Sequence, residues 1–478
     1  MRHLPCWFCK DIQSDYFMTN DTICAISTAP GIGGVAVIRV SGKESIAICS
    51  KLFHPHKKGK DLSCQKAYTL SYGAIIHGKE TVDDVVAALF RSPHSFTGED
   101  TVELTCHGSL YIQQRILELL LAHGCRMARP GEFTQRAFMN GKMDLSQAEA
   151  VADLIASTSE GQHRLAMNQM KGGFSKELKN LRKQLLEITS LMELELDFAD
   201  HEELEFADRS ELKKLASQIE NAMLHLAHSF KAGNAIKNGI PVAIIGKTNA
   251  GKSTLLNRLL NEDKAIVSAI HGTTRDVIED TTLIKGQLFR FIDTAGIRNT
   301  TDAIENLGIE RTFQKIEQSS IVLWMIDAVD ALQQIKEIGN DIFHRCKNKQ
   351  LIIVLNKVDL IETQLDLKHL IPTNMPIIYI SAKEGKNVEE LQRKLTEATQ
   401  ITPTQQGDII VSNVRHFEAL NHALDSIHRV QDGLENNLSG DFISQDLREC
   451  IFHLSNIVGE VTTDQVLGNI FSHFCVGK

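Results

Sequence analysis

The stretch Gly246-Lys-Thr-Asn-Ala-Gly-Lys-Ser253 decides the fold of the middle of this chain. It has the spacing G-x-x-x-x-G-K-S, follows the apolar run 242–245 and opens the helix-like run 253–260. A strand, a glycine-rich loop and a helix in this order predict a phosphate-binding loop, in which backbone N–H groups and the helix N-terminus surround phosphate oxygens. In such a loop Lys252 supplies a point charge at the β- and γ-phosphates, and the Ser253 hydroxyl ligates magnesium. The loop alone leaves ATP and GTP open.

The base is predicted by a second motif, Asn356-Lys-Val-Asp359, which follows the apolar run 351–355. It therefore stands at the carboxyl end of a buried strand, where ligands bind in doubly wound sheets. The Asp359 carboxylate can accept hydrogen bonds from guanine N1–H and the N2 amine, whereas adenine would leave it unpaired. Unpaired polar groups discriminate strongly, about 10⁴-fold in comparable sites. Ser381-Ala-Lys383 follows another apolar run and fits the loop behind guanine O6, so the sequence predicts GTP.

Two more motifs lie between these, in the chain order typical of a GTPase. Thr273-Thr-Arg-Asp276 is a candidate for the loop that closes on magnesium, and Asp293-Thr-Ala-Gly296 for the loop beside the attacking water. Ras-like GTPases orient that water with a glutamine after the glycine, but Ile297 has no polar atom to offer. Asn249 could instead hold a monovalent cation against the phosphates, and Glu305 could act through a second water. A loop-stabilising amide and a solvated helix face are the alternative interpretations of these two side chains.

The region 238–400 alternates short apolar runs with helical stretches, which predicts a P-loop G domain with a doubly wound, mostly parallel sheet. The flanking regions 142–237 and 401–478 have helical character, so the G domain is predicted to be inserted into a helical bundle domain. One amphipathic helix is marked by apolar residues at three- and four-residue steps: Leu178, Leu181, Leu185, Ile188 and Met192.

The N-terminal part of the chain has a different texture. Residues 22–140 alternate β-rich runs with turns and contain one helical pattern at 110–123, which predicts a mixed α+β domain at 19–141. Residues 1–18 contain Cys6 and Cys9 without the second cysteine pair that zinc would need, and they are predicted to be a disordered tail. The predicted fold class is therefore multidomain, α+β followed by helical and α/β parts.

Composition places the 478-residue chain among soluble globular proteins, with 42% apolar and 23% charged residues. The net charge of −9 provides no global basic field, so RNA would need a local patch, a pocket or a basic partner. No apolar run is long enough to span a membrane, and the N-terminus lacks the apolar core of a signal peptide, which predicts a cytoplasmic protein. The ten scattered cysteines favour reduced thiols.

Several stretches together resemble the MnmE (TrmE) family, the bacterial and organellar tRNA modification GTPases within the TrmE/Era-like group. They are the block 130–155, which begins Pro-Gly-Glu-Phe-Thr and contains Asn140-Gly-Lys142, the phosphate-binding loop, Gly-Thr-Thr-Arg-Asp at 272–276, the run 293–298 with the later 304–312, and the C-terminal Phe-Cys-Val-Gly-Lys. The resemblance extends from about residue 20 to residue 478. The terminal peptide and the 130–155 block are its specific parts, because other GTPase families share the remaining motifs.

The resemblance implies a function and a set of partners. Members have a folate-binding-like N-terminal domain, here 19–141, through which they form a constitutive homodimer. With the flavoprotein partner MnmG (GidA), which carries FAD and uses NADH, they form a heterotetramer. The complex adds a carboxymethylaminomethyl-type group to C5 of the wobble uridine of certain tRNAs, and a tetrahydrofolate derivative supplies the one-carbon unit. GTP hydrolysis is stimulated by potassium as two G domains meet.

The resemblance also assigns site residues. Potassium would be held by Asn249, Ser268, Ile270 and Thr273, and magnesium by Ser253 and Thr274; Glu305 would be the catalytic glutamate. Folate would contact Arg39, Glu103, Lys142 and Lys478. The full GTP-binding set would be Asn249, Ala250, Gly251, Lys252, Ser253, Thr254, Ser268, Ala269, Ile270, His271, Gly272, Thr273, Thr274, Asp293, Thr294, Ala295, Gly296, Asn356, Lys357, Asp359, Ser381, Ala382 and Lys383.

Some features stay open at this level. Ile32 stands where relatives commonly carry arginine, which removes a positive charge near the folate loop. Cys475 is either a participant in tRNA chemistry or a buried structural thiol. A ribosome-assembly GTPase is the alternative function, but it would predict a basic RNA-binding appendage such as a KH module, and none follows the G domain. We expect the partner to provide much of the basic surface for tRNA.

Overall fold

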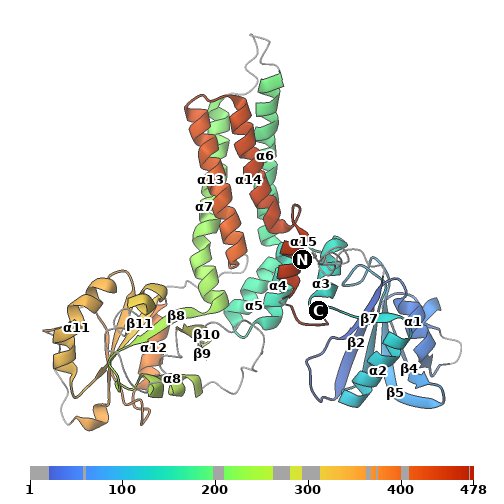
Figure 1. The fold of residues 1–478 in the computed structure, drawn as a ribbon, viewed down its shortest axis with the longest axis horizontal. Coiled ribbons are helices and arrows are strands. Elements are labelled where there is room, and N and C mark those ends of the chain that lie inside the picture. The colour runs from blue at the N-terminus through green and yellow to red at the C-terminus, as the bar shows by residue number, and fades with distance from the viewer. Residues whose placement is uncertain are drawn as a thin grey trace, which may run out of the picture. The chain divides into compact units, whose positions relative to one another are not determined.

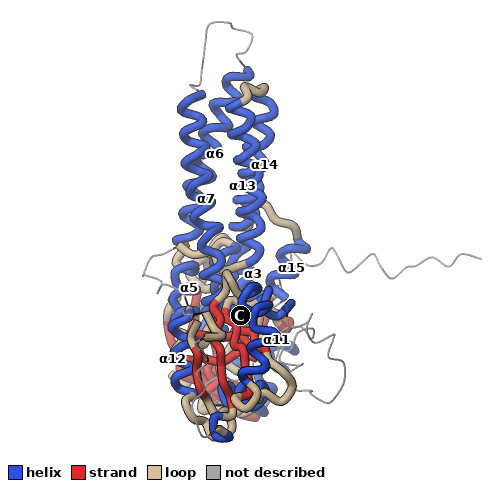
Figure 2. The backbone as a smooth tube through the Cα atoms, turned by 90° about the vertical axis from the view of Figure 1, so that its left-hand side faces the viewer, coloured by secondary structure: helices blue, strands red, loops and turns tan. Residues whose placement is uncertain are grey.

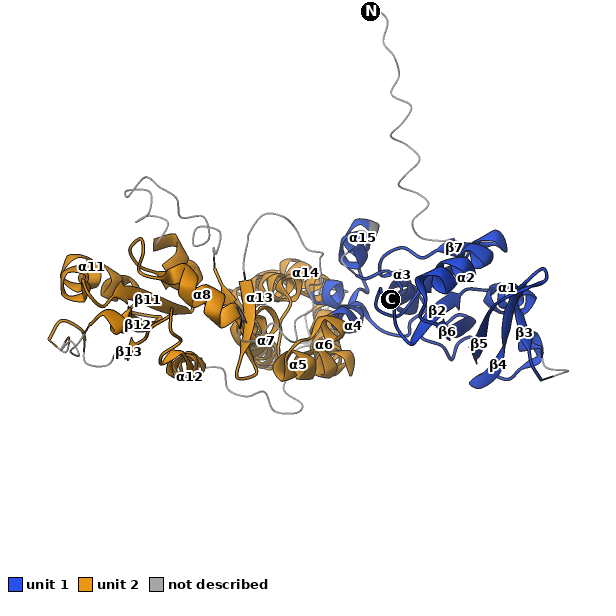
Figure 3. Cartoon of the chain, turned by 90° about the horizontal axis from the view of Figure 1, so that it is seen from below, with its two compact units in different colours: residues 1–152, 454–478 blue, residues 153–453 orange. Residues whose placement is uncertain are grey.

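The computed structural model describes residues 21–57, 61–197, 209–261, 280–292, 313–361, 367, 369–372, 375–399, 409–472 and 474–477 (Figure 1). The chain divides into two compact units, residues 1–152 with 454–478 and residues 153–453 (Figure 3). We call them unit 1 and unit 2. The predicted tail 1–18 lies outside the described residues.

Among the described residues of unit 1, seven strands form one sheet in the order β3-β4-β5-β6-β2-β1-β7. All neighbours are antiparallel except β1 and β7. The strands are β1 (Thr22–Ile26), β2 (Val35–Ser41), β3 (Phe53–Pro55), β4 (Thr69–His77), β5 (Glu80–Phe90), β6 (Thr101–His107) and β7 (Cys125–Met127). The helices are α1 (Ser45–Leu52), η1 (Leu62–Cys64), α2 (Leu110–Ala122), α3 (Glu132–Met139) and α15 (Asp464–Ser472), with α4 (Leu145–Ala156) leaving the unit.

One face of this sheet is covered by helices, whereas the other face is exposed along β4 and buried at β1, where Ile23 and Ala25 cluster with Phe133. Alternate residues of β2, β4, β5 and β6 pack with α1 and α2 into an apolar core, as the period of two along a strand requires. The positions between them face the other way, and Leu70 and Tyr72 on β4 are 68% and 58% exposed. The predicted α+β character of this region, with a helix near 110–123, is confirmed.

The C-terminal peptide is held against β1, far from it in sequence. Val476 forms an antiparallel bridge with Pro130, and Ser27 Oγ donates to the carbonyl of Gly477 over 3.2 Å. Gly477 has a φ of 94°, and a Cβ there would lie 2.2 Å from the Ile26 carbonyl oxygen. Only glycine fits this position, because both the backbone conformation and the space exclude a side chain.

Unit 2 contains a bundle of long helices (Figure 2). The predicted apolar stripe from Leu178 to Met192 is buried at all five positions, so this amphipathic helix is confirmed. The bundle helices are α5 (Glu160–Met170), α6 (Gly173–Asp197), α7 (Arg209–Asn238), α13 (Val414–Glu435) and α14 (Gly440–Val458), the last of which ends in unit 1.

The G domain forms the rest of unit 2. Within its described residues, six strands are ordered β13-β12-β11-β8-β10-β9, and all neighbours are parallel except β9 and β10. The elements are β8 (Ile240–Ile245), α8 (Lys252–Asn261), β9 (Asp280–Ile284), β10 (Gln287–Phe291), β11 (Ile321–Asp327), α11 (Ala331–Arg345), β12 (Gln350–Asn356), η2 (Val358–Leu360), β13 (Ile377–Tyr379) and α12 (Val388–Ala398). Apolar cores line both faces of the sheet, so the predicted doubly wound fold is confirmed.

The bundle runs directly into the G domain. Helix α7 ends at Asn238, Gly239 turns the chain with a φ of 86°, and β8 begins at the next residue. The chain that returns from the G domain packs on the same helix, because Gly233 of α7 leaves room for the Val411 carbonyl, which a Cβ would meet at 2.1 Å. The Val411 N–H donates to Ser229 Oγ over 3.0 Å.

In the described part of the chain, none of the helices combines the length and the hydropathy needed to cross a membrane. Eight of the ten cysteines lie among the described residues, and none of these eight is in a disulfide.

Candidate functional site

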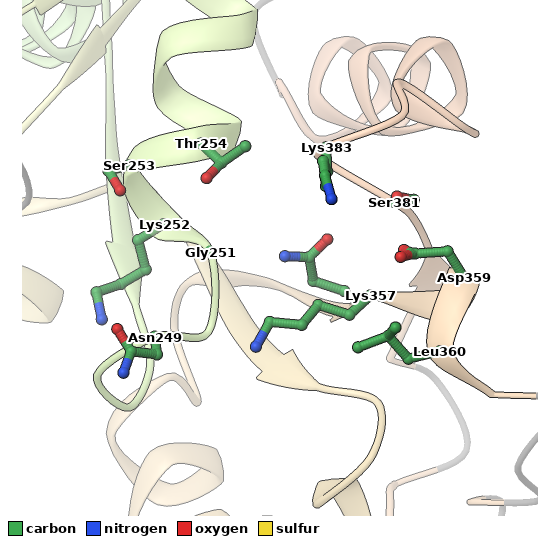
Figure 4. A pocket seen from close by; sticks show the side chains of 11 residues that line it. Asn249, Gly251, Lys252, Ser253, Thr254, Lys357, Asp359, Leu360, Ser381 and Lys383 are labelled. Atoms are coloured by element: carbon green, nitrogen blue, oxygen red, sulfur yellow. The ribbon is translucent and has the colours of Figure 1, made fainter.

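The predicted phosphate-binding loop and guanine motifs meet at one pocket of about 340 Å³ (Figure 4). The loop joins β8 to α8, and the other side of the pocket follows the carboxyl ends of β12 and β13, as the parallel order of the sheet requires. The lining residues are Asn249, Gly251, Lys252, Ser253, Thr254, Asn356, Lys357, Asp359, Leu360, Ser381 and Lys383.

Two glycines shape the loop. Gly246 has a φ of 146°, and a Cβ there would lie 2.2 Å from the Met325 carbonyl oxygen of the neighbouring strand. Gly251 has a φ of 93°, and its Cβ would lie 2.1 Å from Asn356 Nδ2. Both positions combine a left-handed backbone with no free space, so the loop can approach its neighbours only without side chains.

Lys252 lies folded against the loop. Its Nζ donates to the carbonyl oxygens of Gly246 and Lys247, each over 2.7 Å. Burial, followed by the nearby charge of Lys315, lowers the pKa of Lys252 to about 8. The loop thus places a cation where phosphate oxygens would replace backbone carbonyls as its partners. Asn249 has a φ of 63°, and its side chain lines the pocket beside Lys252 (Figure 4).

Asn356 holds the two sides of the pocket together. It is 3% exposed, its Nδ2 donates to the Ala250 carbonyl over 2.8 Å, and its Oδ1 accepts from the Ala382 N–H over 2.9 Å. Both the NH₂ group and the oxygen of this side chain are therefore hydrogen-bonded within the protein. It fixes the spacing between the phosphate loop and the 381–383 loop.

Asp359 is positioned on the base side of the pocket. A hydrogen bond from Ser381, with smaller contributions from Lys383 and Lys357, lowers the pKa of the Asp359 carboxyl, so it is ionised at neutral pH. Lys357 itself donates to Asp327 Oδ2 over 2.6 Å, which holds its stem across the pocket floor. An ionised carboxylate that faces a pocket is an acceptor for a base edge with two adjacent N–H groups.

The structure thus brings together many of the residues predicted for GTP, including Ala250 and Ala382, which Asn356 holds. Leu360 lines the pocket, and sequence reasoning missed it because an isolated leucine after a motif carries no signal. Among the described residues no cluster of three or more His, Cys, Asp or Glu side chains could hold a metal. The predictions that lie outside the described residues concern Ser268, Ala269, Ile270, His271, Gly272, Thr273, Thr274, Asp293, Thr294, Ala295, Gly296, Glu305 and Lys478.

The residues predicted for folate lie in unit 1. Arg39 and Glu103 face each other on β2 and β6, and Arg39 Nε donates to Glu103 Oε1 over 2.8 Å. The Arg39 guanidinium lies 5.4 Å from the ring centroid of Phe96 and 5.6 Å from that of Phe133. Lys142 donates to the carbonyl of Pro93 over 2.8 Å. Arg39 and Lys142 therefore both contact the segment 93–98.

A cluster of five charged side chains lies in the same unit. Arg126 pairs with Asp21 and Glu132, and Arg136 pairs with Asp21, Glu99 and Glu132. We call this set the unit 1 charge cluster. Burial opposes ionisation of Glu132, but Arg126, the Arg129 N–H and Arg136 outweigh it and lower the pKa of this carboxyl. Sequence reasoning missed the cluster, although Glu132 and Arg136 stand in the family-like block 130–155.

Comparisons with known proteins agree over nearly the whole chain. A family model described as the MnmE helical domain matches residues 145–475, and one described as the GTP-binding protein TrmE N-terminus matches residues 22–142. The tRNA modification GTPase MnmE of Parabacteroides distasonis is 68% identical over 459 residues, which cover 96% of this chain and 100% of that protein.

Other relatives extend the same picture. The tRNA modification GTPase MnmE of Bacteroides thetaiotaomicron is 63% identical over 467 residues, which cover 96% of this chain and 100% of that protein. Among solved structures, an Era variant of Aquifex aeolicus bound to GDP and AlF4⁻ is 31% identical, with 39% of this chain and 66% of that chain covered. Its TM-score is 0.26, so it adds no argument.

Proposed function

The chain belongs to the MnmE family of tRNA modification GTPases, and on that premise we propose a specific reaction for it. Potassium-stimulated GTP hydrolysis drives, together with an FAD-dependent partner of the MnmG (GidA) kind, the addition of a carboxymethylaminomethyl-type group to C5 of the tRNA wobble uridine. NADH and FAD act on the partner, and the reaction takes place in the cytoplasm.

One observation carries the nucleotide part of this proposal: the pocket has a phosphate side and a base side held at a fixed spacing by Asn356. At Gly246 and Gly251 a Cβ would collide with neighbouring atoms, so the loop backbone carries no side chain at these positions. A bare backbone of this kind allows phosphate oxygens to approach closely. Lys252 exchanges its backbone carbonyls for the β- and γ-phosphates. Asp359 accepts from the guanine edge, and Lys383 lies behind the base.

The metal ions of the proposal are assigned to residues on the phosphate side. Magnesium would be held by Ser253, which lines the pocket, with Thr274. Potassium would be held by Asn249, which lines the same pocket, with Ser268, Ile270 and Thr273. Both ions would supply positive charge to the phosphates during hydrolysis. Glu305 is proposed to orient the attacking water through a second water, in place of the glutamine that Ile297 replaces.

The folate part rests on unit 1. Arg39, Glu103, Lys142 and the terminal Lys478 are proposed to hold a tetrahydrofolate derivative, with cations toward its glutamate tail and Glu103 toward its pterin N–H groups. Because Arg39 and Glu103 are already paired over 2.8 Å, the ligand has to extend or replace that pair. Titration calorimetry with a tetrahydrofolate derivative tests the assignment: Arg39→Met and Glu103→Gln should each weaken binding.

A second copy of the chain is proposed to cover the exposed face of the unit 1 sheet. That face carries Leu70, Tyr72 and Val35, which are 68%, 58% and 65% exposed. Leu70 and Tyr72 lie on β4 and Val35 on β2, and exposed large apolar side chains on one face of a sheet are typical of a protein interface. Sedimentation of the Leu70→Asp, Tyr72→Asp double variant should show monomers, and an unchanged dimer would contradict this interface.

The whole proposal is tested by mass spectrometry of tRNA nucleosides from cells that lack this protein, rescued with the wild-type chain or Glu305→Ala. We expect the modified wobble uridine to disappear, to return with the wild type and to stay absent with the variant. An unchanged nucleoside profile in the deletion strain would refute the tRNA role and direct attention to ribosome assembly.

A further inference from the structure

The start of helix α6 carries a concentration of positive charge in an acidic chain. Between residues 171 and 186 there are five lysines and arginines and one acidic residue, Glu177, whereas the whole chain has a net charge of −9. A solvated helix face normally mixes both signs of charge. The excess here is therefore a local feature that neither the nucleotide pocket nor the fold requires.

Four lysines of this region form a stripe. Lys176, Lys179 and Lys183 stand at three- and four-residue steps on α6, on the side opposite the buried Leu178 and Leu185. Lys171 precedes the helix and is exposed like the other three. We call Lys171, Lys176, Lys179 and Lys183 the lysine stripe. Asn180 shares its face and is also exposed.

The described residues leave the lysine stripe almost without ion pairs. In the part of the chain that the structure describes, the side chains of Lys171, Lys176 and Lys179 make no ion pair or hydrogen bond. Lys183 has one loose contact, 3.9 Å from Glu187. Lys247, which is also exposed, is instead paired closely with Glu337 over 2.7 Å. The stripe thus keeps its charge available to a partner.

We propose that the lysine stripe binds the phosphodiester backbone of the tRNA; this rests on the proposed function. Successive lysines are separated by about 4.5 and 6 Å along the helix axis, so they can each meet a phosphate of one strand. Lysine ammonium groups act as point charges that attract phosphates without reading bases, and they position an RNA rather than select its sequence. Asn180 adds a donor for a sugar or phosphate oxygen.

The inference predicts a defined salt dependence. Each phosphate contact lowers the slope of log K against log salt by about 0.7 to 0.9. The slope should therefore be less steep by about 2 to 3 for the Lys176→Gln, Lys179→Gln, Lys183→Gln variant. This variant should also bind tRNA about tenfold or more weakly at moderate salt. Glutamine keeps a high helix propensity, so α6 should persist.

The experiment uses the full-length chain, a fluorescent tRNA transcript and potassium chloride from 50 to 200 mM. The matched control removes three exposed lysines of α7 in the same unit: Lys213→Gln, Lys214→Gln, Lys231→Gln. GTP hydrolysis without tRNA checks that both variants are folded. We expect weaker, less salt-sensitive binding for the stripe variant and near wild-type binding for the control.

Three results would overturn the proposal: unchanged tRNA binding by the stripe variant, an equal loss in the α7 control, or intact tRNA binding with a weakened complex with the flavoprotein partner. The last result would assign the stripe to an acidic protein surface. Failure of the stripe is distinguishable from failure of the proposed function, because the wild-type chain would still restore the modified nucleoside in the deletion strain.

Discussion

The nucleotide pocket and the unit 1 charge cluster both gather ionisable side chains, but the two regions use them differently. In the pocket, Asn356 carries the structural hydrogen bonds, while Lys252 and Asp359 line open space. In the cluster, every charged group is matched by another, as Arg136 is by Asp21, Glu99 and Glu132. In the pocket, one residue supports the structure and others are available to a ligand. In the cluster, the charged groups are all paired with one another.

The difference indicates what each region does for the molecule. A charge that lines a pocket and can exchange partners is suited to a ligand, whereas a charge held by two or three partners is suited to fixing segments in place. The cluster joins Asp21 before β1, Glu99 before β6 and Glu132 at the start of α3. Substitutions in the pocket should therefore change nucleotide chemistry, and substitutions in the cluster should change stability.

The largest expected effect belongs to Lys252→Ala. Removal of the one cation held inside the loop should lower the kcat of GTP hydrolysis by about 10³-fold, because the transferred charge loses its partner. Lys247→Ala is the control, since Lys247 points away to Glu337 over 2.7 Å. Phosphate-release assays should show a change within about threefold for the control. Equal losses in both variants would contradict a specific role of Lys252 in hydrolysis.

Asp359→Asn should change the base that the pocket accepts. The amide can no longer accept from both N–H groups of guanine, so GTP affinity should fall by about 10²- to 10³-fold. Xanthosine triphosphate carries a carbonyl at C2, to which the new amide can donate, and it should bind better to the variant than GTP does. Competition titrations with both nucleotides measure this. Retained preference for GTP would place base recognition elsewhere.

Glu132→Gln tests the unit 1 charge cluster. The neutral side chain leaves Arg126 and Arg136 short of a partner, so unit 1 should lose about 2 to 3 kcal/mol of stability while GTP hydrolysis stays near wild type. The exposed Glu118→Gln, which removes a 3.2 Å surface pair with Arg115, should cost at most about 0.5 kcal/mol. Urea unfolding of the full chain, followed through hydrogen exchange of unit 1 peptides, measures both.

The same pair of proteins has a pH dependence with a definite sign. The pKa of Glu132 is lowered in the folded chain, so its contribution is present above the unfolded value of about 4.3 and is lost as the pH falls below it. The difference in stability between wild type and Glu132→Gln should therefore shrink in acid. A difference that stays constant from pH 7 to pH 3 would show that the effect is not electrostatic.

The smallest expected effect concerns Lys252 itself. Because its pKa is about 8 in the free pocket, the loop loses this charge as the pH rises from 7 to 9. GTP binding then has to take up a proton, and Kd should rise by about tenfold over that range. Calorimetry in two buffers of different ionisation enthalpy reports the proton uptake. Lys252→Arg, which stays charged, should show a flatter profile.

Much of the fold could be predicted because its signals are local. The P-loop spacing, the apolar strands and the stripe on α6 each lie within one short segment, and the family-like stretches add the domain order. Strand β9 was not predicted, since Asp280–Ile284 is short and follows no apolar run. The glycines of the loop are visible in the sequence. The atoms that exclude a side chain at these positions, the Met325 carbonyl and the Asn356 amide, are not.

The candidate sites were less evenly predictable. Asn356 was recognised as part of a guanine motif, yet its work lies in bonds to Ala250 and Ala382, which are distant in sequence. The unit 1 charge cluster was invisible because its members come from separate segments, and each reads as an ordinary surface charge. Glu305 and the loop from Ser268 to Thr274 lie outside the described residues, so their assignments stay predictions.

The junction between α7 and β8 has a mechanical consequence. Helix α7 contains 30 residues, which makes it about 45 Å long, and it continues through Gly239 into the strand that carries the phosphate loop. A change of angle at Gly239 would therefore move the far end of the helix by a larger distance than the junction itself. A tilt of about 10° at Gly239 would move the far end of the helix by about 8 Å, so a small rearrangement that reached Gly239 from the nucleotide site would become a displacement about the size of a nucleotide.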